Sequence, residues 1–224
     1  MATAAPPPQT RADTLTSAIL LASAGGCLDA FLYLNHGHVF AGAMTGNVVL
    51  LGLALLSHNP REILQHTVPL VAFFLGVWAA ELLQARHRPH AVTVGLLGEA
   101  LGLVACSFAP PTFPDLAFVP LLVFLAAYQV SSFREVDGFS YNSTFITGNL
   151  RTLVVGLFEA RQPDQRTHGL RQARELGLVV LGFLLGAVAA AVLAPRFGNR
   201  TLHLPAATLL GVLALSLRAG SKQP

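Results

Sequence analysis

The sequence predicts an all-α fold, a polytopic bundle of transmembrane helices. Of its 224 residues, 53% are hydrophobic and only 11% are charged, and the mean hydropathy is +0.59. Soluble domains carry about 25% charged residues, so a globule of this composition could not cover its surface with polar groups. Long apolar runs separated by short polar breaks indicate instead that lipid surrounds most of the chain.

Eight apolar segments are candidate membrane helices, because a helix needs about 17 to 20 apolar residues to cross the hydrocarbon core. They lie at 14–34, 39–57, 66–85, 91–109, 115–133, 141–159, 175–194 and 202–218. Prolines and charges mark the breaks between them, among them 58–61, Pro110-Pro111 and Pro195-Arg196. Residues 1–13, small, polar and proline-rich, predict a disordered tail, and residues 219–224 form a short C-terminal tail.

Two of these segments contain the same polar motif. Met44-Thr45-Gly46-Asn47-Val48 aligns with Ile146-Thr147-Gly148-Asn149-Leu150 at an offset of 102 residues (147 − 45 = 102). The same offset carries each of the other first-half segments onto, or across, a segment found independently. We therefore expect a four-element unit used twice, as membrane repeats 14–110 and 111–218.

The arginines and lysines favour one of two topologies. If all eight segments cross and the N-terminus is inside, eight basic residues lie inside and five outside. If the two Thr-Gly-Asn segments enter the membrane and leave it on the same side, ten basic residues lie inside and three outside. Arg151 is not counted for either topology. The positive-inside rule favours the second arrangement. It predicts six crossings, inverted halves, Asn47 close to Asn149, and cytoplasmic termini; broken helices that cross fully are the alternative.

The Thr-Gly-Asn motifs are suited to interrupting a helix. Glycine permits unusual backbone angles, and threonine and asparagine side chains can satisfy the freed backbone groups. Half-helix ends would then face a solute, while the alternative is a polar clamp between helices. Asp29, inside the first segment, has two corresponding interpretations: a contact to a proton, cation or polar solute, or a hydrogen-bond partner for the broken backbone. Glu99 is either a second titrating group or a structural hydrogen-bonding group.

Several motifs resemble those of the YoaK-like bacterial membrane proteins, a domain of unknown function. The first-half resemblance lies in Gly26-Cys27-Leu28-Asp29-Ala30, Tyr33-Leu34, Gly37, Val39-Phe40 and 44–47; the second-half resemblance lies in Gln129, Phe133-Arg134, Gly138 and 142–150. Val130 departs from the pattern, in which a polar residue would follow the glutamine. The resemblance covers about residues 15–218 and implies a bacterial inner-membrane location and a fold, without an activity.

The leading functional prediction is a transporter or channel for an unknown small solute or ion. The candidate binding residues are Asp29, Thr45, Gly46, Asn47, Glu99, Gln129, Asn142, Thr147, Gly148 and Asn149. One alternative is a non-transporting assembly partner that uses Gly98–Gly102 and Gly182–Gly186 as contact faces. An intramembrane enzyme using Asp29, His36 and His38 is disfavoured, because the sequence contains no known arrangement of residues that activates a nucleophile. We expect no enzyme activity, cofactor, metal or nucleic-acid partner. The expected partners are the lipid bilayer and the solute, and a homo-oligomer is a further alternative.

Overall fold

The computed structural model describes residues 14–133, 135–136, 139–144 and 146–220, with only the backbone described at 87–91, 135, 219 and 220. The tail at 1–13, Arg134 and Gly138 of the sequence motifs, and residues 221–224 lie outside the described residues. The elements are α1 (Leu15–Asn35), α2 (Met44–Ser57), α3 (Pro60–Ser107), α4 (Asp115–Ser132), β1 (Glu135–Val136), β2 (Phe139–Ser140), α5 (Ile146–Glu159), α6 (Arg166–Phe197), the 3-10 helix η1 (Gly198–Leu202) and α7 (His203–Gly220). The predicted all-α class is confirmed, with one short hairpin of β1 and β2 added.

Four stretches in the described chain are long and apolar enough to cross a membrane, judged by length and composition. They are Leu15–Asn35, Pro60–Arg86, Asp115–Ser132 and Arg166–Arg218, and the last combines α6, η1 and α7. Met44–Ser57 and Val92–Ser107 are shorter apolar helices. Large apolar side chains such as Phe74, Trp78 and Leu185 are more than half exposed, as expected where lipid covers the outer surface.

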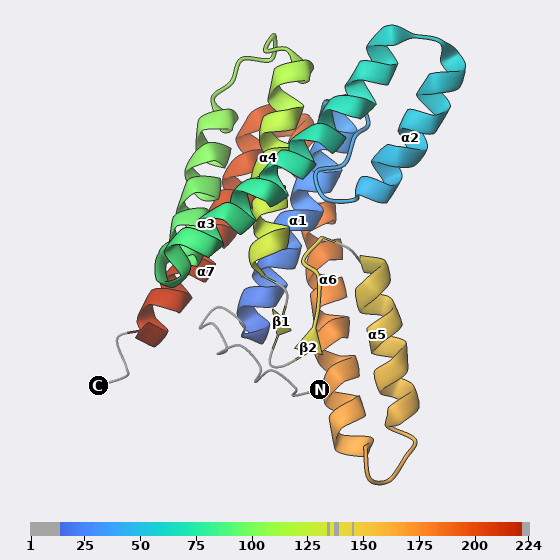
Figure 1. Cartoon of the computed structure of the whole chain (residues 1–224), viewed down its shortest axis with the longest axis vertical. Coiled ribbons are helices and arrows are strands. Elements are labelled where there is room, and N and C mark those ends of the chain that lie inside the picture. Colours follow the sequence, from blue (N-terminus) through green and yellow to red (C-terminus); the bar gives the residue numbers. More distant parts are fainter. Residues whose placement is uncertain (1–13, 134, 137–138, 145, 221–224) are drawn as a thin grey trace.

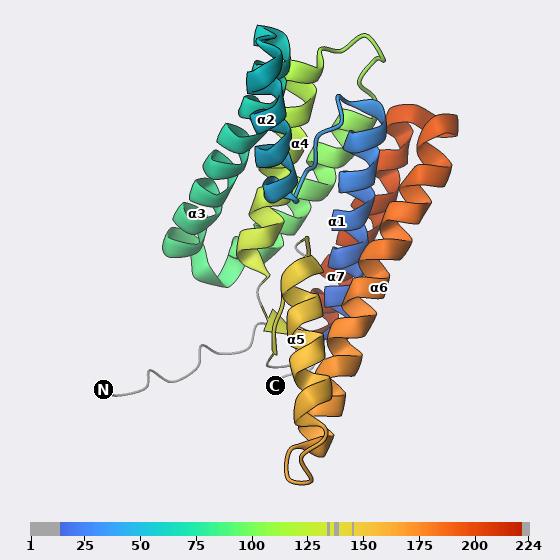
Figure 2. The ribbon, with the colours of Figure 1, turned by 90° about the vertical axis from the view of Figure 1, so that its right-hand side faces the viewer.

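The long helices run between two ends of the molecule (Figures 1 and 2). We call the end where α1 finishes and α4 begins the upper end, and the opposite end the lower end. The ribbon of α3 descends from the upper end, turns back about midway down the molecule and rises again, so that this one helix has two arms. α6 rises to η1 at the upper end, and α7 runs back toward the lower end.

α2 and α5 are half-length helices that begin near mid-height of the molecule, at the side of the bundle (Figures 1 and 2). After α1 the chain turns back into the molecule before Met44, and α2 returns to the upper end. After α4 the chain passes through the β1–β2 hairpin, and α5 runs from mid-height to the lower end. The two helices have 14 residues each, which at 1.5 Å per residue is too short for a hydrocarbon core of about 30 Å.

Glycines allow the closest helix contacts. A Cβ atom on Gly182 of α6 would lie 2.9 Å from the Ile19 carbonyl oxygen of α1, and Gly186 approaches the Ser23 carbonyl more closely still. In the same way, Gly76 of α3 packs against the Phe124 carbonyl of α4. Gly182 and Gly186 therefore contact the protein's own first helix, so the prediction that they form a face for a partner is wrong.

Several predicted boundaries differ from the structure. Pro195-Arg196 does not end a helix: α6 continues to Phe197 and ends at Gly198, whose φ of 53° favours glycine. Pro195 lacks the N–H group that would donate to the carbonyl four positions earlier, so the helix continues past it with one hydrogen bond fewer. The Thr-Gly-Asn segments, predicted at 39–57 and 141–159, are helical only from Met44 and Ile146, because the described residues before each motif form bends and irregular backbone rather than helix.

Candidate functional site

Asn47 and Asn149 form the same pair of hydrogen bonds in the two halves of the chain. The Asn47 carboxamide accepts from the Phe40 N–H at 2.8 Å and donates to the Phe40 carbonyl at 2.8 Å. The Asn149 carboxamide accepts from the Asn142 N–H at 2.9 Å and donates to the Asn142 carbonyl at 2.7 Å. Both asparagines are buried, and each bonds a residue seven positions earlier. They thus hold the backbone that leads into α2 and α5, as expected of side chains that satisfy freed backbone groups where a helix is interrupted, whereas the alternative was a clamp between two helices. We call each of these local pairs of bonds an asparagine clamp.

Asp29 is held by the backbone that precedes α2. Its Oδ1 atom accepts a hydrogen bond from the Gly42 N–H at 2.7 Å, and the N–H groups of Ala41 and Ala43 lie beside the same carboxylate. Successive N–H groups at the start of a helix form a favourable environment for an anion. The side chain is 5% exposed, so this local environment, rather than bulk water, compensates its negative charge.

The two interrupted segments meet at Gly42 and Thr144. A Cβ atom on Gly42 would lie 2.5 Å from the Thr144 Cβ, and one on Gly25 of α1 would lie 2.9 Å from the Ser143 carbonyl oxygen. Gly42 and Thr144 are 102 residues apart (144 − 42 = 102), which is the offset between the two motifs. Equivalent positions of the two motif segments therefore contact each other, and only glycine at position 42 leaves room for the threonine.

A cavity of about 820 Å³, which we call the Asp29 cavity, lies between α1, α6 and the two motif segments. Both motif threonines, Thr45 and Thr147, line it together with Asp29 and Gly148. Its remaining walls are mostly apolar and come from α1, α6 and the motif segments: Gly26, Ala30, Tyr33, Leu34, Phe40, Ala43, Thr144, Ile146, Phe183, Ala187, Val188 and Ala191. This volume is in the range of small-molecule sites.

A second cavity of about 420 Å³, the Asn149 cavity, lies between α3, α4 and the start of α5. Its walls are Phe73, Val77, Val130, Ser131, Ser140, Tyr141, Asn142, Gly148, Asn149 and Thr152. Gly148 lines both cavities, and Thr144 and Asn142, two residues apart, line one each. The second motif segment thus contributes a wall to both cavities, with Gly148 common to them.

Four predicted site residues line neither of these cavities: Gly46, Asn47, Glu99 and Gln129. Gly46 makes room for the Phe40 ring, which would lie 2.9 Å from a Cβ there. Gln129 donates to the Leu21 carbonyl of α1 at 3.0 Å. Glu99 is 2% exposed, and its two carboxyl oxygens have no hydrogen-bond partner among the described residues. The prediction missed the aromatic cavity residues Phe40 and Phe183, because no polar residue marks Phe183 within α6.

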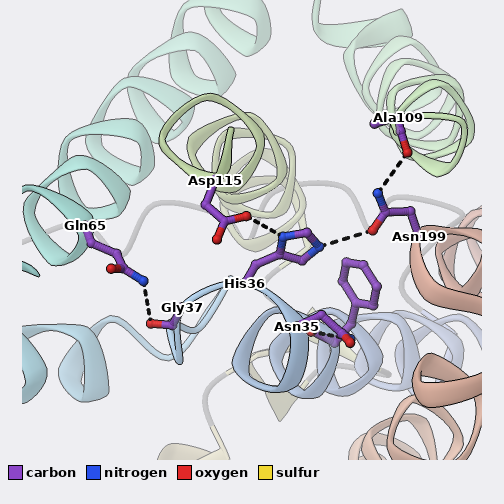
Figure 3. Close-up of polar contacts among 8 residues, drawn as sticks. Asn35, His36, Gly37, Gln65, Ala109, Asp115 and Asn199 are labelled. Atoms are coloured by element: carbon purple, nitrogen blue, oxygen red, sulfur yellow. Dashed lines mark hydrogen bonds and ion pairs between the residues drawn. The ribbon is translucent and has the colours of Figure 1, made fainter. Parts of the chain in front are cut away.

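A polar network at the upper end connects segments from both halves (Figure 3). The Nδ1 atom of His36 lies 2.7 Å from Asp115 Oδ1, and its Nε2 atom lies 3.2 Å from Asn199 Oδ1. Asn199 also donates to the Ala109 carbonyl at 3.0 Å. His38 points elsewhere, with Nδ1 2.9 Å from the Tyr33 carbonyl. The two histidines therefore do not share a ligand position, and no group of three or more His, Cys, Asp and Glu side chains suited to a metal occurs in the described chain.

The comparisons with known proteins agree with the membrane character of these helices. The chain is 30% identical over 202 residues to the UPF0700 transmembrane protein YoaK of Bacillus subtilis (strain 168), covering 87% of this chain and 90% of that protein. No solved structure matches. The family described as "Protein of unknown function (DUF1275)" matches residues 17–215. The predicted YoaK-like resemblance is thus confirmed, and the chain is a membrane protein that belongs to the DUF1275 family.

Proposed function

We propose that this protein transports a small solute through a site between its two motif segments. The observation that carries the proposal is the pair of cavities that share Gly148. Along α1, Tyr33 and Leu34 extend the Asp29 cavity toward the upper end, whereas Ser140 of β2 and Thr152 of α5 extend the Asn149 cavity toward the lower end. A solute that passes the wall at Gly148 would move from one end of the molecule to the other.

The proposed topology has six crossings and two inverted halves. α1, the two arms of α3, α4, α6 and α7 would cross, while α2 and α5 would enter from opposite sides and return. The matching clamps of Asn47 and Asn149 support equivalent roles for the two motifs. Inverted repeats with interrupted helices at the substrate site are a common transporter plan.

The residues that line the two cavities also support equivalent roles for the two halves of the chain. Phe73 and Val77 of α3 line the Asn149 cavity, and Phe183 and Ala187 of α6 line the Asp29 cavity. Each pair is 110 residues apart (183 − 73 = 110; 187 − 77 = 110), eight more than the offset between the motifs. The extra residues lie between α5 and the cavity-lining part of α6. The proposal places both termini in the cytoplasm, on the strength of the ten-to-three distribution of basic residues.

The alternative of an intramembrane enzyme has less support. Its three candidate side chains have separate partners: Asp29 bonds the Gly42 N–H, His36 approaches Asp115, and His38 approaches the Tyr33 carbonyl. General acid–base catalysis requires groups that converge on one reacting atom. We therefore propose a role without catalysis.

The direct test is uptake by the purified protein in liposomes, with labelled amines, amino acids, carboxylic acids, sugars and Na⁺ or K⁺ as probes. The informative variant is Gly148→Phe, because Gly148 lines both cavities, a Cβ there meets nothing within 4 Å, and the added ring would occupy the boundary between them. We expect it to abolish uptake while the protein still folds.

The matched control is Gly52→Phe. Gly52 is also an exposed helical glycine with nothing within 4 Å of an added Cβ, but it lies on α2 and lines neither cavity. It should retain the uptake of the parent protein. Uptake by the Gly148→Phe variant equal to that of the parent would contradict a route through the shared wall, and no uptake of any probe by the parent would contradict transport of these classes.

A further inference from the structure

The charge of the Asp29 cavity restricts what can bind there. Among the described residues that line it, Asp29 alone carries a formal charge, and neither lysine nor arginine is present. The backbone N–H groups that would otherwise attract an anion already face the Asp29 carboxylate. An anionic solute would therefore meet a like charge without any basic side chain to compensate it, which is costly in a mostly apolar site.

The walls restrict the shape and polarity of the solute. Tyr33 and Phe40 stack with their ring centroids 5.1 Å apart at an interplanar angle of 23°, and both line the cavity together with Phe183. Aromatic faces attract cations as well as apolar groups. The hydroxyl groups of Thr45, Thr144 and Thr147 are the other polar features that the motif segments contribute.

A bare metal ion does not suit this cavity. Hard cations such as Ca²⁺ require six to eight oxygen ligands, whereas here one carboxylate, already hydrogen-bonded, lies in a wall that is mainly carbon. A cavity of about 820 Å³ is also far larger than such an ion. The same walls suit a molecule that combines an apolar body with one positive group.

We propose that the Asp29 cavity binds an amphiphilic organic monocation, with its ammonium group toward Asp29 and its apolar body against Phe40 and Phe183. This inference rests on the proposed function, because it names the class of solute that the transporter takes. It assigns the threonine hydroxyls the role of secondary acceptors for ammonium N–H groups.

Three probes of similar shape test the inference: 2-phenylethylammonium, 2-phenylethanol and phenylacetate, measured by equilibrium dialysis against the purified protein in detergent. We expect saturable binding of the ammonium probe, weaker binding of the alcohol and none of the carboxylate. Asp29→Asn should weaken ammonium binding about tenfold or more and leave binding of the alcohol unchanged, because the amide has nearly the shape of the carboxylate but no charge.

Glu159→Gln is the control for loss of a negative charge elsewhere, because Glu159 ends α5 and lines neither cavity. It should bind all three probes as the parent does. If Asp29→Asn does not fold, Phe183→Leu replaces it and should weaken ammonium binding by loss of the aromatic wall. Preferential binding of phenylacetate, or no saturable binding of the ammonium probe, would overturn the inference.

The outcomes separate this inference from the transport proposal. Saturable ammonium binding without uptake of labelled 2-phenylethylammonium into liposomes would keep the cation site and contradict transport of this solute. Uptake of carboxylates in preference to amines would keep transport and overturn the cation assignment.

Discussion

The carboxamide groups of Asn47 and Asn149 each hold a stretch of backbone that has left regular helix. Asparagine suits this task because one side chain offers both an acceptor and a donor, which match the N–H and C=O of a single residue. Phe40 and Asn142 provide those groups seven positions earlier. Each motif segment is therefore held by the asparagine of its own motif, and in the first segment the Asp29 carboxylate adds a bond from the Gly42 N–H.

Asn47→Ala and Asn149→Ala should each lower the thermal unfolding midpoint in detergent. Each substitution removes the two hydrogen bonds to the backbone seven positions earlier and leaves that N–H and C=O without their side-chain partner, at a cost of roughly 1–3 kcal/mol for each stranded group. Asn35→Ala is the control, because Asn35 is exposed and makes one bond to the Phe31 carbonyl at 3.1 Å. Midpoints of the two variants equal to that of the control would contradict the clamp role.

Much of the residue-scale site could be predicted from the sequence. A polar Thr-Gly-Asn motif in an apolar run must satisfy freed backbone groups, and Asp29 in lipid must find partners; the structure provides both sets of partners. The partners themselves could not be predicted, because the bonds to Phe40 and Asn142 depend on how the chain turns before the helix. Phe183 reaches the cavity only through the packing of α6 on α1, which no local pattern specifies.

At the scale of elements, the contact between α1 and α6 depends on small residues. In lipid, helices associate through close packing, because removing apolar side chains from water no longer drives their association. Whether a backbone carbonyl of one helix fits against the other helix therefore determines how closely the two pack. Gly186 lies against the Ser23 carbonyl, and Gly182 lies against that of Ile19. This contact also positions Phe183, so it shapes the Asp29 cavity.

Gly186→Ala should destabilise the protein by about 1–3 kcal/mol, because the added methyl group overpacks the contact and forces the helices apart. Gly177→Ala on the same helix is the matched control: its Cβ would lie 3.4 Å from Leu153 Cδ1, an ordinary contact. Alanine there should be neutral or stabilising by up to about 1 kcal/mol, because of its higher helix propensity. Chemical denaturation in mixed micelles measures both variants, and equal stability of the two would contradict the packing argument.

The positions of some helices could be predicted from the sequence, and the starts of others could not. Apolar length predicted where α1, α4 and α7 lie, because each is a nearly uninterrupted apolar run. It placed α2 and α5 too early, since non-helical residues such as Val39 and Phe40 are as apolar as the helix that follows. Hydropathy reflects whether a residue is surrounded by apolar groups, and an irregular segment packed in the molecule has the same surroundings as a helix.

The whole molecule contains two half-length helices, α2 and α5, and two cavities that share one wall. α2 and α5 start near mid-height and run toward opposite ends (Figures 1 and 2), and the segments that precede them meet at Gly42 and Thr144. The central claim is therefore that α2 and α5 enter the bilayer from opposite sides and return without crossing it.

Cysteine accessibility in intact cells tests this claim most directly. Single substitutions His58→Cys, in the turn after α2, and Asp164→Cys, in the turn after α5, are each labelled with a membrane-impermeant maleimide before and after permeabilisation. The native Cys27 and Cys106 are buried, and the parent protein controls for their reactivity. The account predicts opposite sides, with His58→Cys labelled in intact cells and Asp164→Cys only after permeabilisation. If all eight segments crossed, both turns would lie on the same side, and labelling of both positions from one side would contradict the account.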